Sequence, residues 1–315
     1  MDTPIVPEAV AEASIAVPLR PPGLWRQGWY RFRRNRGGML GLGLVALVVL
    51  VALLCPFVAP FAPNDQSAML RGAARKAPDW LHLLGTDRNG YDVLTRVLYG
   101  ASTALAVGLG AMAVASVIGV IIGGIAGYAG GLTDELLMRF AEFFMVIPVF
   151  VVILAVVRLF GIVVVGTWLE SIPNLNLMTI IVLLGCFEWP PIARMARAEF
   201  LRLKHAEFVE AAVCIGTKKR DILLRHILPN ALPSLIVLVA LGIGGAILAE
   251  TMVSFLGFGD PKAVSWGQQL HFNYEALKVA PWAVLSPGAA IFVTVLGFNL
   301  LADGLTDAFN PRLRR

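Results

Sequence analysis

The sequence predicts an all-α integral membrane protein with six transmembrane helices. Hydrophobic residues make up 57% of the 315 residues and charged residues only 15%, whereas soluble domains carry about 25% charged residues. The mean hydropathy of +0.75 leaves little of the chain for domains outside a membrane. Apolar runs of membrane-spanning length recur along the chain, bounded by charged residues or proline.

Residues 1–38 are predicted to form a cytoplasmic tail followed by an interfacial elbow helix. Trp25, Trp29 and Tyr30 interleave with arginines that continue through the basic run at 31–36. Such mixtures bind nucleic acid in soluble proteins, but directly before a span they favour rings at headgroup depth and cations on anionic lipid. The apolar run that follows is longer than the apolar region of a signal peptide. We therefore expect this segment to bind membrane lipid and not nucleic acid. We also expect that the first span is retained and not cleaved.

The remaining chain divides by its apolar runs. Residues 39–99 should hold the first span and an external loop, residues 100–310 the other five spans, and residues 311–315 a cytoplasmic tail. The fourth span is short if it stops at Pro190-Pro191, and the second carries Gly119-x-x-x-Gly123, a pattern that lets helices approach closely. The six spans are expected at about 39–60, 101–126, 136–159, 177–187, 232–256 and 282–301.

The distribution of basic residues predicts the orientation. They gather before the first span, between the fourth and fifth, and after the sixth, and an even number of spans places these groups on one side. Lys and Arg accumulate in cytoplasmic loops, so both termini are expected in the cytoplasm. The groups comprise Arg31, Arg33, Arg34, Arg36, Arg194, Arg197, Arg202, Lys204, Lys218, Lys219, Arg220, Arg225, Arg312, Arg314 and Arg315.

The segment at about 194–229 is a charged, helix-forming stretch between two apolar spans. Its apolar positions fall near helical spacing, Gly216 suits a position of positive φ after a helix, and Thr217 can cap a second short helix. Pro229 should end that second helix. An amphipathic linker on the membrane surface would have the same composition. The apolar positions are Leu201, Phe208, Ala212 and Ile215.

The order of residues in this segment resembles the cytoplasmic coupling loop of ABC importer permeases. Glu210-Ala211-Ala212, Gly216 and Leu228-Pro229 carry that resemblance. Further stretches resemble the C-type permease subunit of dipeptide, oligopeptide and nickel importers. They are the stretch Leu84-Gly85-Thr86-Asp87-Arg88-Asn89-Gly90-Tyr91-Asp92-Val93-Leu94-Thr95-Arg96, Gly127-Tyr128-x-Gly130-Gly131-x-x-Asp134 continuing to Arg139, Ile147-Pro148, Ser254-Phe255-Leu256-Gly257-Phe258-Gly259, Ser265-Trp266-Gly267, Pro281-Trp282 and Phe298-Asn299-Leu300-Leu301-x-Asp303-Gly304-Leu305-x-Asp307.

The resemblance implies a fold and a function. The fold would be a type I ABC importer transmembrane domain with a cytoplasmic coupling helix, in a bacterial inner membrane. The partners would be a B-type permease subunit, two ATPase domains that bind ATP and Mg, and an external solute-binding protein, and this chain would hold no cofactor. Glu210, Ala211, Ala212, Gly216, Leu228 and Pro229 would couple the permease to the ATPase. Peptides would be the solutes, with nickel chelates, opines or oligosaccharides as alternatives.

Two other classes of function have less support from the residues of this sequence. An ion-coupled secondary transporter would show inverted repeats and broken mid-membrane helices, and a membrane-embedded enzyme would cluster catalytic groups. The chain has no G-x-x-x-x-G-K-[ST] motif for ATP and no metal-ligand spacing. Asp87-x-Asn89-Gly90-x-Asp92 resembles part of a calcium loop but favours a turn with a helix cap. Glu250, an acid inside the fifth span, is expected to face the pore, a partner helix or water.

Overall fold

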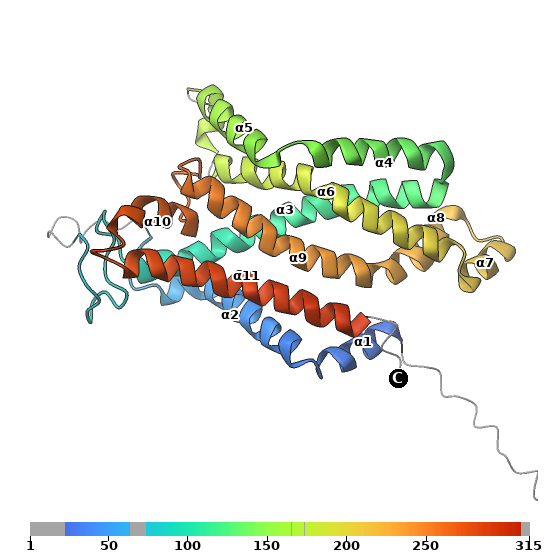
Figure 1. Cartoon of the computed structure of the whole chain (residues 1–315), viewed down its shortest axis with the longest axis horizontal. Helices are drawn as coiled ribbons and strands as arrows, with labels where there is room; N and C mark the ends of the chain where they lie inside the picture. Colours follow the sequence, from blue (N-terminus) through green and yellow to red (C-terminus); the bar gives the residue numbers. More distant parts are fainter. Residues whose placement is uncertain (1–22, 64–73, 165, 173, 310–315) are drawn as a thin grey trace, which may run out of the picture.

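The long helices lie side by side in one elongated bundle, with short helices at both ends (Figure 1). The computed structural model describes residues 23–63, 74–164, 166–172 and 174–309, so the predicted tails lie outside the described residues. No strand forms in these parts of the chain, although Thr86 and Asp92 make an isolated bridge. The helices are α1 (Leu24–Phe32), α2 (Arg36–Val58), α3 (Val93–Ala129), α4 (Gly131–Val146), α5 (Val149–Val164), η3 (Trp168–Ser171), α6 (Leu175–Lys204), α7 (Glu207–Cys214), α8 (Lys219–Asp221), the π-helical turn η4 (Ile222–Ile227), α9 (Leu228–Phe255), α10 (Trp266–Asn273), η5 (Tyr274–Ala276) and α11 (Trp282–Phe309).

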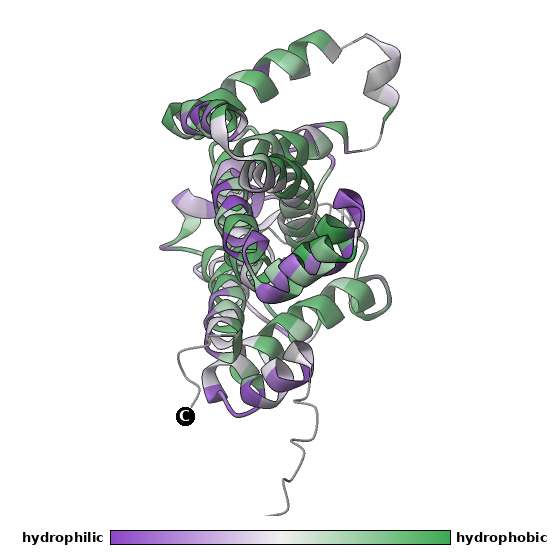
Figure 2. Ribbon diagram, turned by 90° about the vertical axis from the view of Figure 1, so that its right-hand side faces the viewer, coloured by the Kyte–Doolittle hydropathy of each residue, from purple (hydrophilic) through white to green (hydrophobic). Residues whose placement is uncertain are grey.

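Among the described residues, five helices are long and apolar enough to cross a membrane, and the bent pair of α4 and α5 would count as a sixth span if its two helices cross together. The long helices are mostly hydrophobic in Figure 2. The predicted third span is not one straight helix, because α4 and α5 meet at 74°. The bend falls at Ile147-Pro148, where proline disfavours helical backbone at the residue before it. In Figure 1, α5 consequently points away from the axis of α4.

The fourth span, which would be short if it stopped at Pro190-Pro191, does not stop there, because the 30-residue helix α6 runs through both prolines. Proline is tolerated inside membrane helices when neighbouring helices and local adjustments satisfy the freed backbone groups. The neighbour here is α3, whose Gly119 approaches the Trp189 carbonyl oxygen so closely that a Cβ would lie 2.8 Å from it. Gly123 approaches the Ala193 carbonyl oxygen in the same way. The predicted small-residue pattern is therefore the contact face of α3 on α6.

The elbow helix α1 packs against the end of α11, where the Trp25 and Phe309 rings meet edge to face at 5.5 Å. Phe32 is buried, while Trp25 and Trp29 are about half exposed. Asn35 caps α2 by accepting a hydrogen bond from Gly38 N at 2.8 Å. An amphipathic α1 at the bundle end fits the predicted interfacial elbow.

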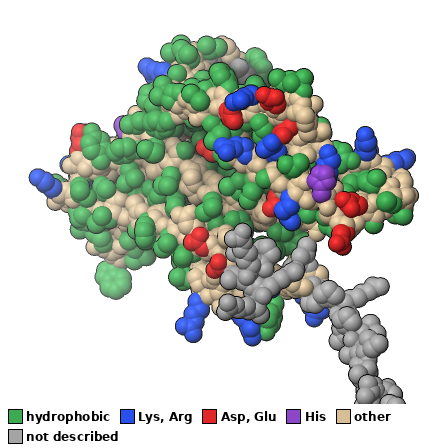
Figure 3. All heavy atoms as spheres, turned by 45° about the vertical axis from the view of Figure 1, so that its right-hand side comes forward, with side chains coloured by type: hydrophobic (Ala, Val, Ile, Leu, Met, Phe, Trp, Pro, Cys, Tyr) green, Lys and Arg blue, Asp and Glu red, His purple; other side chains and the backbone are tan. Residues whose placement is uncertain are grey.

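The predicted basic groups of the described residues lie at one end of the bundle. The carboxyl ends of α1, α6 and α11 and the short helices α7 and α8 share this end, which we call the α7 end (Figure 1). Figure 3 shows Lys, Arg, Asp and Glu side chains gathered toward it, beyond a body covered by hydrophobic side chains. The opposite end carries α10 and the loop before α3, and is called the α10 end.

Candidate functional site

The α7 hairpin, residues 207–227, is folded against the bundle by apolar residues that belong to the main buried core. Val209 and Ala212 are only 2% and 4% exposed, and they belong to the same buried cluster as Ile222 and Ile227. Of the predicted coupling residues, Glu210 and Ala211 are exposed and Ala212 is buried. Ala212 therefore holds α7 in place, while its neighbours face outward.

The predicted apolar face of this segment is wrong in part. Phe208 is 42% and Ile215 83% exposed, whereas Ala212 points inward. The helix breaks at His205, between α6 and α7. Helical spacing cannot be continued across such a break, so Leu201 and the later positions do not share one face.

Gly216 ends α7 as predicted. Its φ is +78°, and Gly216 N donates to Val213 O at 2.9 Å while Thr217 N donates to Ala212 O at 3.0 Å. These two bonds form a Schellman motif, which glycine adopts without steric cost. Thr217 does not cap the next helix. Lys218 takes that position, with no side-chain cap.

Pro229 does not end a helix, contrary to the sequence-based expectation. The helical chain runs without a break from Lys219 to Phe255, through the π turn and into α9. Pro229 is the second residue of α9 and directly follows the π turn Ile222–Ile227, a local adjustment of the kind that accommodates proline within a membrane helix. Leu228 and Pro229 are both partly buried at this junction.

The outer surface of the hairpin combines apolar and basic side chains. Phe208, Val213, Ile215 and Leu224 are 42–83% exposed, and Lys218, Lys219 and Arg220 are exposed beside them. Exposed apolar groups rimmed by charge are typical of a protein-docking surface. Sequence reasoning missed Val213 and Leu224, which only the inward orientation of Val209 and Ala212 reveals.

Glu250 lies near the α10 end of α9, five positions before its last residue, Phe255. Its side chain is buried, at 2% exposure, and its Oε1 accepts a hydrogen bond from Ser254 Oγ at 2.6 Å. A second hydrogen bond joins it to Ser265, which precedes α10. Within this chain Glu250 therefore links α9 to α10, and a role in the pore stays a prediction.

Replacing Glu250 by leucine is expected to leave folding and assembly largely intact but to lower transport. Ser254 can turn its hydroxyl to the backbone carbonyl four residues back, as Thr251 does to Ile247, so the folding cost should be about 1–3 kcal/mol. Glu250→Gln keeps a hydrogen-bond acceptor at the same place and serves as the control. Uptake into vesicles containing the whole complex is the measurement. Unchanged uptake in the leucine variant would show that Glu250 has a structural role and no role in transport.

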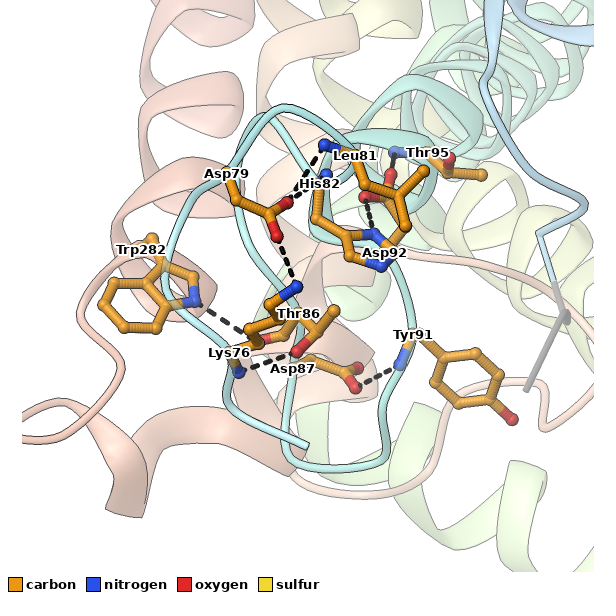
Figure 4. A network of polar contacts seen from close by, with 10 residues as sticks. All are labelled: Lys76, Asp79, Leu81, His82, Thr86, Asp87, Tyr91, Asp92, Thr95 and Trp282. Atoms are coloured by element: carbon orange, nitrogen blue, oxygen red, sulfur yellow. Dashed lines mark hydrogen bonds and ion pairs between the residues drawn. The ribbon is translucent and has the colours of Figure 1, made fainter. Parts of the chain in front are cut away.

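At the α10 end, the loop before α3 is ordered by a polar network (Figure 4). His82 Nδ1 lies 3.0 Å from Asp92 Oδ1 in a buried pair, and Asp92 Oδ2 accepts the cap hydrogen bond from Thr95 N at 2.7 Å. Asp87 Oδ1 accepts from Asn89 N at 2.8 Å and from Tyr91 N at 2.9 Å. The predicted turn and helix cap are confirmed.

Two carboxyl groups of this loop are shifted by their surroundings. Burial raises the pKa of Asp87 above its ordinary value, against the opposing effect of hydrogen bonds to its carboxylate. The pKa of Asp79 is lowered, first by its hydrogen bond with Lys76.

The network also reaches α11, because Trp282 Nε1 donates to Thr86 O at 3.1 Å. The loop is thus a fixed part of the α10 end.

The helical bundle, with helices of membrane-spanning length, is that of a multi-pass membrane protein. The chain belongs to the family of binding-protein-dependent transport system inner membrane components, whose sequence pattern matches residues 119–315. Residues 23–78 match the N-terminal transmembrane domain of oligopeptide transport permease C. The protein is thus a multi-pass inner-membrane permease of the ABC importer type, as the resemblance implied.

Similar curated proteins cover nearly the whole chain. The oligopeptide transport system permease protein OppC of Haemophilus influenzae is 34% identical over 98% of this chain and 94% of its own length. OppC of Bacillus subtilis is 36% identical over 93% and 91%, respectively. The glutathione transport system permease protein GsiD of Escherichia coli is 34% identical over 92% and 91%.

A solved structure shares the fold. The MetNI methionine ABC transporter, in inward-facing conformations, matches with a TM-score of 0.50 and 20% identity, covering 68% of this chain and 96% of that chain. The predicted fold class is confirmed. Among the functional hypotheses drawn from the sequence, the ABC importer permease is the one that family membership supports.

Proposed function

We propose that this chain is the pore-forming C-type permease of an ATP-driven importer for di- and oligopeptides. The proposal is supported by relatives that are named as oligopeptide and dipeptide permeases at 33–36% identity over most of the chain. A glutathione permease at similar identity keeps open other small solutes, and nickel chelates remain an alternative. An importer of this type needs a second permease subunit, and we assign that place to a B-type chain.

The α7 hairpin is the observation that carries the coupling role. Its outer surface offers Phe208, Val213 and Ile215 as exposed apolar anchors, and its inner side is fixed by Val209 and Ala212. We infer that this surface docks an ATPase domain, one of two that bind ATP and Mg, so that hydrolysis takes place outside this chain. Apolar anchors ringed by charge suit such docking.

We propose for this chain the transport cycle that the family resemblance implies. ATP binding draws the ATPase domains together and moves the α7 hairpin with them, and the motion passes into α9, with which the hairpin is continuous. The pore opens toward the external side, where a solute-binding protein releases its peptide. ATP hydrolysis returns the permease to its inward-facing state.

The proposal is tested by expressing this chain together with the proposed partners: the B-type permease, the ATPase and the solute-binding protein. We expect the ATPase to co-purify with this chain and trialanine-loaded binding protein to stimulate ATP hydrolysis several-fold in vesicles. A permease that purifies without an ATPase, or vesicles in which no peptide is taken up, would contradict the assignment. Binding of solutes to the isolated binding protein decides between peptides and nickel chelates.

The topology is a separate prediction. We propose that the α7 end is cytoplasmic, because it carries the basic groups. In a variant lacking Cys55, Cys186 and Cys214, single cysteines at positions 34, 218 and 315 should resist an impermeant thiol reagent in intact cells. Cysteines at 88 and 262 should react; Arg88 stands in for its neighbour Asp87, which is also expected outside but is buried. External labelling at position 218 would overturn the orientation and the coupling argument with it.

A further inference from the structure

A cavity of about 470 Å³ opens at the α10 end between α5, the start of α6 and the turn after α9. Its size falls within the range of small-molecule sites, about 300–1,000 Å³. It lies away from the α7 hairpin and from the loop network of Figure 4. The lining residues come from three separate parts of the chain, and those used below are Val157, Arg158, Ile162, Asn176, Gly257 and Phe258.

Arg158 is the only charged residue of α5, whose other residues are hydrophobic apart from one glycine. Its side chain is exposed toward the cavity and forms no hydrogen bond or ion pair with any residue that the structure describes. A cation on an apolar membrane helix is costly, roughly 2.5–3.5 kcal/mol at the helix centre on insertion scales. Arg158 stands about 9 Å from the last residue of α5, six residues at 1.5 Å each. The guanidinium, exposed to the cavity and without a partner among the described residues, is free to receive an anion.

The acid nearest in the turn, Asp260, does not supply that balance. Its Oδ2 accepts a hydrogen bond from Leu177 N at 3.2 Å, and its Oδ1 accepts from Lys262 N at 2.9 Å. Asp260 is buried, and its carboxylate caps the start of α6. The described part of the cavity thus presents one free cation and no free carboxylate.

The other walls suit an organic anion with an apolar part. Asn176 contributes a side-chain amide, which can donate to an oxygen beside the guanidinium. Val157, Ile162 and Phe258 add apolar surface. Gly257 adopts a φ of +89°, which positions the turn without a side chain at that point.

We propose that Arg158 and Asn176 bind the C-terminal carboxylate of a peptide that enters the permease, with the apolar walls receiving its last side chain. The inference rests on the proposed peptide import and on the external position of the α10 end. The guanidinium fork matches a carboxylate with two parallel hydrogen bonds. A free carboxylate is the one anionic group that all unmodified peptides share, so this site accepts many sequences.

The test compares trialanine with trialanine amide in vesicles containing the whole importer. Each peptide is added at a concentration that saturates the binding protein, so that a difference in affinity for the binding protein does not affect the ratio of import rates. We expect the parent to import the free acid roughly tenfold to a hundredfold faster than the amide, the range that a charge-assisted hydrogen bond supports. Arg158→Gln should bring this ratio close to one, and Arg158→Lys should leave an intermediate ratio.

Matched variants separate this role from others. Lys278→Gln removes an exposed cation at the same end, outside the cavity, and should leave the ratio unchanged. Equal loss of both peptides in Arg158→Gln, with the ratio preserved, would overturn the proposal and indicate a lipid phosphate or a structural partner. If Glu170→Gln, whose side chain lies outside the described residues, caused the same loss of both peptides, the partner of Arg158 would be Glu170 in an ion pair, and the proposal would also fall. A parent complex that imports neither peptide would contradict the proposed function itself, whereas a parent that imports both equally would contradict only this inference.

Discussion

Aspartate at position 212 is expected to open the α7 hairpin and abolish transport. Ala212 is 4% exposed in an apolar cluster with Val209, Ile222 and Ile227. An uncompensated buried carboxylate costs on the order of 3–5 kcal/mol, and release of the hairpin from the bundle into water removes that cost. The variant should still insert in the membrane, because its spans are unchanged. Trypsin should cut it faster after Lys218 and Lys219 in inside-out vesicles, and peptide should no longer stimulate ATP hydrolysis.

Ala211→Asp is the matched control for folding. Ala211 neighbours Ala212 but is exposed, so a carboxylate there stays in water and the rate of tryptic cleavage should equal that of the parent. Any loss of ATPase coupling in this variant would then report on the docking surface alone. If Ala212→Asp resisted trypsin and transported like the parent, the packing argument for the hairpin would fail.

Valine at position 123 is expected to disrupt the bundle. A Cβ at Gly123 would overlap the carbonyl oxygen of Ala193 on α6, and a backbone atom cannot move aside as a flexible side chain can. Overpacking a core costs about 1–3 kcal/mol and occasionally more, so we expect the high end of this range. The yield of folded protein should fall, and Tm in detergent should drop by roughly 5–10 °C.

Gly43→Val provides the comparison for this effect. Gly43 lies in α2, and a Cβ there meets nothing within 4 Å. The same substitution in a membrane helix should therefore change Tm by no more than about 2 °C. Equal stability of the Gly123 and Gly43 variants would show that α3 and α6 separate at little cost, contrary to the close contact described above.

Apolar runs and local turn chemistry were enough to predict much of the fold. The spans followed from composition, because a membrane helix of about 20 residues must be apolar whatever it packs against. Asp92 as a cap and Gly216 as a turn of positive φ were also predictable, since both depend on residues only a few positions away.

Features that depend on distant residues could not be predicted in this way. The helix continues through Pro190-Pro191 because α3 packs along the same stretch, which is a tertiary effect. The orientation of α7 was missed because its inward face is made by Val209 and Ala212, which pack against residues beyond the turn at Gly216, among them Ile222 and Ile227. The cavity around Arg158 brings together three segments that are up to about a hundred positions apart, so no local pattern indicates it.

The unbroken helix from Lys219 to Phe255 has a geometric consequence for how far a small motion can reach. Its 37 residues span about 55 Å at 1.5 Å per residue. If it tilts as a rigid rod about one end, each degree displaces the other end by about 1 Å, so a tilt of 5° shifts Glu250 and the start of α10 by several ångströms. The π turn at Ile222–Ile227 is the one irregular stretch along this rod. The flexibility of this π turn determines how much of a displacement at the α7 end is transmitted to the α10 end.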